Sequence, residues 1–110
     1  MVRFATEKET LDEAIRRLVA AIDPDKIVLF GGRARGDAQA DSDFDLLIVK
    51  PSSDRTYKRV VPAKLALYGI GAAVDITWKT PDEIERWKNV RSHPIAQALL
   101  EGRVVYERPH

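Results

Sequence analysis

Two short apolar segments separated by a polar stretch constrain the fold of this chain most strongly. The first, residues 27–30, ends in Gly31-Gly32. After ten further residues, Asp43-Phe44-Asp45 leads into the second, Phe44–Val49. The second segment is apolar at nearly every position, which is typical of a central strand covered on both faces. We therefore expect an α/β fold in which a small mixed central sheet is flanked by helices.

The N-terminal half supplies two helices around this centre. Apolar residues at helical spacing predict an amphipathic helix over residues 10–22. A second helix is expected over 57–68, with Arg59 on its solvated face. Pro62 must either kink this helix or mark its beginning, because proline cannot donate a helical hydrogen bond.

The C-terminal part predicts two strands with two helices between them. Residues 73–78 have strand character and contain Asp75, an acid among apolar residues. Thr80 begins a capped helix that runs to about residue 89, and a short helix from residue 92 ends at Gly102. A last strand is expected over 103–107, so the predicted order is α-β-β-α-β-α-α-β.

Composition narrows the function further. At 110 residues the chain is expected to be a single domain, 1–110, without a second domain for a large acceptor. Eighteen basic and seventeen acidic residues give a net charge of +1, which does not favour nucleic-acid binding. The absence of cysteine excludes disulfides and thiolate metal sites and suits the cytoplasm, and no apolar stretch reaches membrane length.

The acids of Asp43-Phe44-Asp45 carry the strongest chemical signal. Side chains alternate along a strand, so Asp43 and Asp45 project to the same side with backbones about 6.6 Å apart. Two carboxylates at that separation repel by about 2.5 kcal/mol at an effective dielectric near 20. A divalent cation would offset this repulsion. The alternative is an acidic loop, since Asp37 and Asp41 lie close by in the sequence.

The glycine pair and a third acid extend the pattern. Gly31 and Gly32 would let backbone N–H groups approach phosphate closely, although two glycines after a strand often form only a tight turn. Arg33 and Arg35 follow at once and could clamp phosphate or simply be solvated. Asp75 alone would be a structural acid, but with the pair it makes three oxygen ligands suited to a magnesium–triphosphate site.

Together these motifs resemble the nucleotidyltransferase superfamily that includes DNA polymerase beta. Its signature is Gly-Gly or Gly-Ser, a spacer, Asp-x-Asp and a later third acid. The matching segments are Leu29-Phe30-Gly31-Gly32, Asp43-Phe44-Asp45-Leu46-Leu47 and Val74-Asp75-Ile76. The small size and Arg33-Ala34-Arg35-Gly36-Asp37 are similar to the minimal nucleotidyltransferases of bacteria and archaea, which are usually encoded beside a helical HEPN protein. The resemblance covers essentially the whole chain and implies the nucleotidyltransferase fold.

The resemblance implies a role for each motif residue. Gly31 and Gly32 would hold the nucleotide phosphates, with Arg33 and Arg35 beside them. The catalytic residues and metal ligands would be Asp43, Asp45 and Asp75, and Asp75 would also help to deprotonate the acceptor hydroxyl. Many minimal members have serine where this chain has Gly32, so a hydroxyl contact to phosphate is absent here.

The implied activity is transfer of a nucleoside monophosphate, AMP from ATP, with two Mg²⁺ ions during turnover. The implied acceptor is a hydroxyl of a HEPN toxin, which would make this chain the antitoxin. Two alternatives stay open. One is a non-catalytic antitoxin or nucleotide-binding module that neutralises its partner by complex formation. The other is a small-molecule nucleotidyltransferase, for which a homo-oligomer could supply the missing acceptor site.

Overall fold

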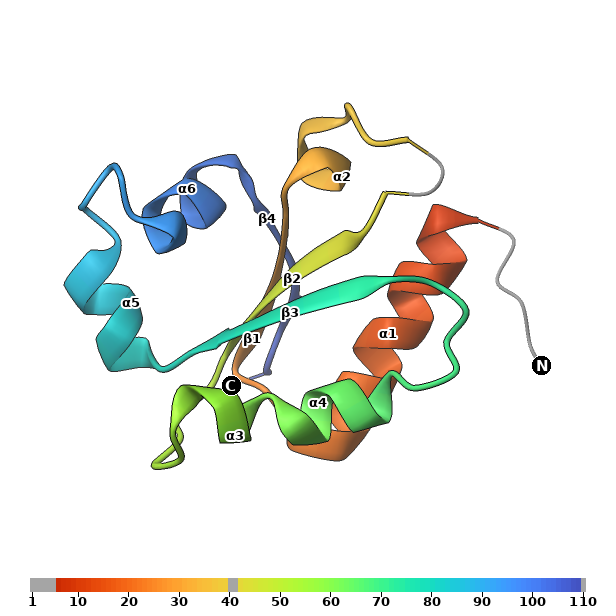
Figure 1. Ribbon diagram of the computed structural model, residues 1–110, viewed down its shortest axis with the longest axis horizontal. Helices are drawn as coiled ribbons and strands as arrows, with labels where there is room; N and C mark the ends of the chain where they lie inside the picture. The colour runs from red at the N-terminus through yellow and green to blue at the C-terminus, as the bar shows by residue number, and fades with distance from the viewer. Residues whose placement is uncertain (1–5, 40–41, 110) are drawn as a thin grey trace.

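The computed structural model describes residues 6–39 and 42–109 and has a four-stranded sheet at its centre (Figure 1). The order of helices and strands agrees with the predicted order in all but two places. A short helix follows Gly31, and two helices take the place of the one expected over 57–68. The elements in chain order are α1 (Glu7–Ile22), β1 (Lys26–Phe30), α2 (Gly32–Arg35), β2 (Phe44–Val49), α3 (Thr56–Arg59), α4 (Val61–Ala66), β3 (Val74–Lys79), α5 (Pro81–Trp87), α6 (Pro94–Glu101) and β4 (Arg103–Glu107).

The sheet is mixed, as predicted, and its strand order is β3-β2-β1-β4. β1 pairs antiparallel with both β2 and β4, whereas β2 pairs parallel with β3. Because β2 and β3 run in the same direction, they begin at the same end of the sheet. Asp45 and Asp75 are the second residues of these strands and lie near that end.

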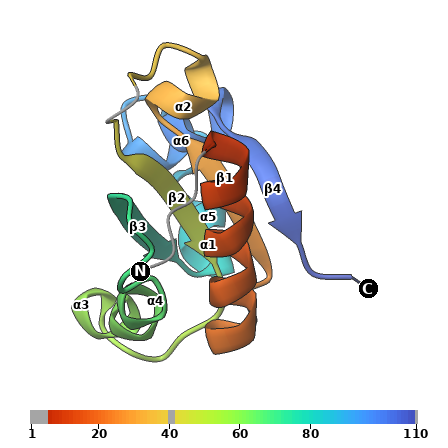
Figure 2. The ribbon, with the colours of Figure 1, turned by 90° about the vertical axis from the view of Figure 1, so that its right-hand side faces the viewer.

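Helices cover both faces of the sheet and create two cores of unequal size. Side chains that alternate along the strands, such as Leu29, Leu46 and Ile76, pack with α1 and α4 in the larger core. On the opposite face, Val28 and Leu47 pack with Ala98 of α6 in a smaller one. Figure 2 shows α1 in front of the sheet, with α3 and α4 beside its lower end and α2 at the top of the molecule.

Helix α1 begins earlier than its apolar pattern predicts, because Thr6 caps it. The Thr6 hydroxyl accepts a hydrogen bond from the Glu9 N–H at 3.0 Å and so satisfies one of the first donors of the helix. The helix ends at Asp23, whose left-handed backbone (φ 45°) lets its N–H reach the Val19 carbonyl. Within the described ranges, no helix combines the length and apolar character needed to cross a membrane.

Pro62 marks the beginning of a helix rather than a kink within one. It lies in the first turn of α4, where a missing N–H costs no helical hydrogen bond. Val60 separates α3 from α4. The expectation that Arg59 is solvated was wrong: Arg59 is only 8% exposed.

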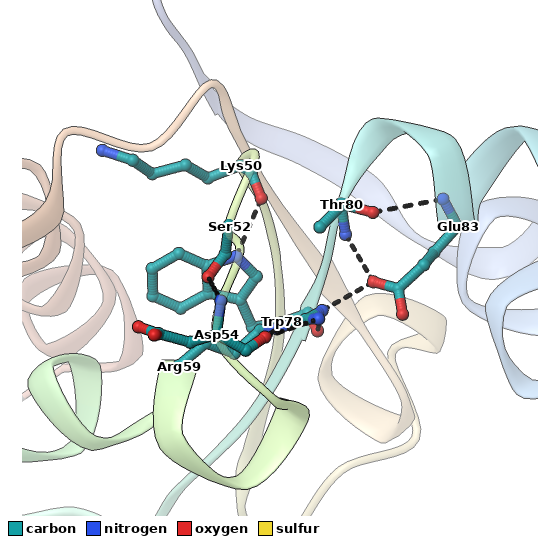
Figure 3. A network of polar contacts seen from close by, with 7 residues as sticks. All are labelled: Lys50, Ser52, Asp54, Arg59, Trp78, Thr80 and Glu83. Atoms are coloured by element: carbon teal, nitrogen blue, oxygen red, sulfur yellow. Dashed lines mark hydrogen bonds and ion pairs between the residues drawn. The ribbon is translucent and has the colours of Figure 1, made fainter.

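Arg59 belongs to a polar network that fixes α3 and α5 to the C-terminal end of β3 (Figure 3). Its guanidinium donates to the Glu83 carboxylate at 2.6 Å and to the Asp54 carbonyl at 3.1 Å. Glu83 also completes the predicted capping box, since it accepts from the Thr80 N–H at 2.8 Å. Burial alone would raise the pKa of Glu83, but the hydrogen bonds from Thr80 and Arg59 outweigh it and hold the pKa below its ordinary value of 4.5.

Candidate active site

Asp45 and Asp75 are direct neighbours across the parallel pair of strands β2 and β3. Neighbouring strands lie about 4.8 Å apart, so the two residues project side by side from the same face of the sheet. That face is the one that carries the smaller core. The sequence pattern selected both residues, and the parallel register brings them together.

Asp43 lies two residues before Asp45 and is exposed just ahead of β2. The Asp45 carboxylate is partly buried, and this desolvation raises its pKa above the ordinary value of 3.8. The negative charges of Asp75 and Asp43 raise it further, whereas Arg35 opposes them. Both neighbouring acids therefore act on Asp45, and the electrostatic potential at this carboxylate is negative enough to disfavour its ionised form.

Gly31 joins β1 to α2 and lies directly against Asp45. Its φ of +72° is a conformation that side chains with a Cβ rarely adopt. A Cβ added there would meet Asp45 Oδ2 at 2.2 Å, so a side chain has no space at this position. Both the backbone conformation and the lack of space therefore require glycine at this turn between β1 and α2.

Helix α2 is a single turn that starts at Gly32. The first N–H groups of a helix have no acceptor within the helix and can donate to a phosphate. A Cβ added at Gly32 would meet Asp37 Oδ1 at 3.0 Å, a tight but less severe contact than at Gly31. The turn predicted from the glycine pair therefore forms next to the acids.

The two arginines that follow the glycines have different surroundings. The Arg33 side chain is 8% exposed; its guanidinium donates to the Ser42 carbonyl at 2.7 Å, pairs with Glu7 at 3.0 Å and lies 4.0 Å above the ring of Phe44. Arg33 thus ties the start of α1 to the segment that leads into Asp43 and Asp45. Its guanidinium is engaged by protein groups.

Arg35 is nearly half exposed and pairs with Asp37 at 3.0 Å and Glu101 at 3.1 Å. These pairings raise the pKa of its guanidinium. Its charge also acts on Asp45. The sequence pattern did not select Glu101, because no local motif links the end of α6 to α2; only the folded sheet brings Glu101 near the acids.

The donor set suits a hard divalent cation. Mg²⁺ is usually held by one or two carboxylates together with substrate phosphates and water. The negative charges of Asp75 and Asp43 help to raise the pKa of Asp45 despite the opposing charge of Arg35, and a cation would offset this repulsion. Among residues 6–39 and 42–109, no three His, Cys, Asp or Glu side chains converge closely enough to hold an ion by themselves. Phosphate oxygens would therefore have to complete the coordination.

Comparison with protein families shows to which family the chain belongs. The family described as nucleotidyltransferase domain matches residues 8–105, nearly the whole chain. The chain belongs to the nucleotidyltransferase domain family. The membership confirms the family resemblance and fold predicted from the glycine pair and the three acids, and it assigns the general activity to nucleotidyl transfer.

Two solved structures share the nucleotidyltransferase fold of this chain. A toxin–antitoxin crystallised with AMP-PNP aligns with a TM-score of 0.62 over 88% of this chain and 73% of the other, at 18% identity. A protein from Sulfolobus solfataricus that is assigned as a nucleotidyltransferase aligns with a TM-score of 0.58 over 96% and 93%, at 21% identity. No curated protein sequence matches the chain.

Proposed function

We propose that this nucleotidyltransferase transfers AMP from ATP to a hydroxyl group of a partner protein and acts as an antitoxin. The observation that carries the proposal is the pairing of Asp45 with Asp75 beside the Gly31 turn. This pairing provides oxygen ligands for a cation next to a backbone that a phosphate can approach. Family membership supports the reaction class.

The position of each residue in the candidate site suggests its role in the reaction. Gly31, Gly32 and Arg35 contact the phosphates, and Arg33 fixes the segment that presents the acids. Asp45 and Asp75, with Asp43 beside them, would hold Mg²⁺ together with phosphate oxygens, and the ion would supply positive charge to the α-phosphate and to the departing pyrophosphate. The acceptor oxygen forms a bond to the α-phosphorus while the bond from this phosphorus to the bridging oxygen breaks and pyrophosphate leaves. Asp75 takes the proton of the acceptor hydroxyl.

A HEPN-type toxin is the proposed acceptor. The name of one structural neighbour, a toxin–antitoxin with AMP-PNP, combines a protein partner with a nucleotide analogue and so supports both parts of the proposal. The resemblance to minimal nucleotidyltransferases supports the same class of partner. Both lines of support concern relatives, so the acceptor has to be tested directly.

An exposed apolar row on α3 and α4 supports a protein partner as well. Leu65 is 69% and Tyr68 87% exposed, and the exposed Val61 and Tyr57 lie one and two turns before Leu65. Exposed apolar surface of this kind marks protein contacts. No acidic residue lies between positions 55 and 74, whereas Lys58 and Lys64 are exposed there. Two copies of this row would repel, so the fitting partner surface is apolar with an acidic rim.

The test is to incubate the chain, a candidate HEPN-type acceptor protein, Mg²⁺ and ATP labelled at the α-phosphate. The label should appear on the partner, and it should be lost in Asp45→Asn and Asp75→Asn or after chelation of the metal. The matched control is Asp54→Asn, which changes an exposed acid beyond the C-terminal end of β2.

Three outcomes separate the candidate activities. Label on the partner in the wild type alone supports the proposal. Protection from the toxin by Asp45→Asn without any label would instead assign a non-catalytic antitoxin. Label on small hydroxyl compounds but not on protein would assign a small-molecule nucleotidyltransferase.

A further inference from the structure

A cavity of about 380 Å³ lies on the same face of the sheet as Asp45 and Asp75. Its volume is within the range of sites that hold small molecules. Asp75 forms part of its wall, so the cavity adjoins the proposed catalytic centre directly. Its lining comes from the sheet (Phe30, Leu47, Asp75, Thr77 and Lys79) and from the start of α6 (His93, Pro94, Ile95 and Ala98).

Two polar groups of this cavity have no partner among the described residues of the protein. The Thr77 hydroxyl and the Lys79 ammonium make no hydrogen bond or ion pair with any part of the chain that the structure describes. Lys79 is half-buried and lines the cavity. Both groups can donate hydrogen bonds to a ligand.

His93 is held in one orientation. Its Nδ1 accepts a hydrogen bond from the Ile95 N–H at 3.1 Å, and its ring stacks on Trp87 with a centroid separation of 4.5 Å and an angle of 14°. Because Nδ1 is the acceptor, the proton of the neutral ring lies on Nε2. His93 therefore offers a third fixed donor at the cavity. The sequence pattern had given this histidine no role.

The chemistry of the lining favours a flat, uncharged heterocycle. Phe30, Leu47, Ile95 and Ala98 give an apolar floor, and the three donors suit a ring with acceptor nitrogens or oxygens. Asp75 at one end disfavours a free anion such as phosphate. A nucleobase combines these properties.

The order of the groups along β3 agrees with this assignment. Asp75, Thr77 and Lys79 alternate along the strand and project from one face, with Lys79 about 13 Å beyond Asp75. The Gly31 turn lies on the other side of the acids, against Asp45. A nucleotide whose phosphates are at that turn can extend past the acids and along this row.

We propose that this cavity binds the nucleoside base of the substrate, an inference that rests on the proposed nucleotidyl transfer. Thr77, Lys79 and His93 donate to acceptor atoms of the base, while the apolar floor that includes Phe30 contacts one face of its ring. The phosphates and the base are then held by different parts of the chain. Binding of each half can therefore be measured separately.

The experiment compares two probes by calorimetry with Mg²⁺ present: α,β-methylene-ATP, whose bridge resists transfer, and inorganic tripolyphosphate, which lacks the nucleoside. Thr77→Val and Lys79→Met should each weaken binding of α,β-methylene-ATP about tenfold, the effect of one lost hydrogen bond, and leave tripolyphosphate binding unchanged. Lys64→Met, which removes the same charge from α4 on the opposite face, should change neither.

A measurement without variants guards against misfolding. In the wild type, amide resonances of Thr77, Ile95 and Ala98 should shift with α,β-methylene-ATP but not with tripolyphosphate. Equal effects of the cavity variants on both probes, or no shifts at α6, would overturn the base site and suggest that the cavity receives the acceptor. Failure of the wild type to bind either probe would instead refute the proposed function itself, and the base site with it.

Discussion

The α-carbon of Gly31 lies so close to the Asp45 carboxylate that an added Cβ would overlap Oδ2 at 2.2 Å. The turn and the acid are therefore one structural unit, in which the backbone of the first fixes the position of the second. This contact explains why a motif of two glycines and a motif of two acids occur together at a fixed spacing. It also leads to the sharpest prediction for activity.

Gly31→Ala should displace the Asp45 carboxylate and greatly reduce nucleotidyl transfer. Gly36→Ala is the matched control, because Gly36 has a similar φ of +84° but no atom of a described residue within 4 Å of an added Cβ. Both variants should lose about 1–2 kcal/mol of stability from backbone strain. Denaturation and transfer assays of the two variants test this. Equal activity of both variants would show that the contact with Asp45 is unimportant.

Asp45→Asn should stabilise the free protein at neutral pH. The pKa of Asp45 is raised in the folded state, so the folded chain holds this proton to higher pH than the unfolded chain does. Stability attributable to Asp45 therefore falls as pH rises above 3.8 and is lowest once the folded carboxyl has ionised. The expected gain at pH 7 is about 0.2–1 kcal/mol, since the group is partly open to solvent.

Thermal unfolding of wild type and Asp45→Asn across pH 4–8 measures this effect. The difference in Tm should shrink as pH falls, and Mg²⁺ should reduce it at pH 7 by stabilising the wild type. Asp54→Asn, at an exposed acid, should show no comparable trend. A constant difference at every pH would contradict the electrostatic explanation.

Arg33→Leu and Arg35→Leu should separate stability from phosphate binding. Arg33 is buried and donates to the Ser42 carbonyl, so its loss should cost about 2 kcal/mol. Arg35 is 47% exposed, so its loss should cost less than about 1 kcal/mol but weaken tripolyphosphate binding. Denaturant titration and calorimetry provide the two readouts. If Arg33→Leu kept full stability and lost phosphate binding, Arg33 would contact the phosphate itself.

Leu65→Glu should abolish binding to the partner protein while transfer chemistry within the site remains intact. Leu65 is exposed on α4, so the substitution should change stability by less than about 0.5 kcal/mol. Its added negative charge would face the acidic rim that we expect on the partner. Lys88→Glu on the opposite side of the sheet is the control, and unchanged affinity in Leu65→Glu would exclude this surface.

The sequence predicted much of this fold because its elements are locally encoded. The apolar run of β2 and the capping box at Thr80 each depend on a few neighbouring residues, and both occur as expected. The burial of Arg59 could not be foreseen, because its partner Glu83 lies on another helix. Local pattern alone places a lysine or arginine of α3 in solvent.

The sequence pattern proposes the residues of the candidate site but not their geometry. The positions of Gly31, Asp45 and Asp75 follow from motif spacing. Their contact depends on the parallel register of β2 with β3, which long-range packing sets. For the same reason no local pattern predicted a role for His93, because its orientation depends on Trp87 and on a cavity that forms only after α6 packs on the sheet.

The unequal division of the core has a consequence for how such a chain can change over time. Among the described residues, fourteen buried side chains form the cluster on the face packed by α1 and α4, whereas Val28, Leu47 and Ala98 form the smaller cluster on the face that carries the acids. Most of the folding free energy thus comes from the face that takes no part in the chemistry. Mutations around the substrate therefore remove only a small part of the stability of the fold. Such a chain can acquire new nucleotide or acceptor substrates and still fold.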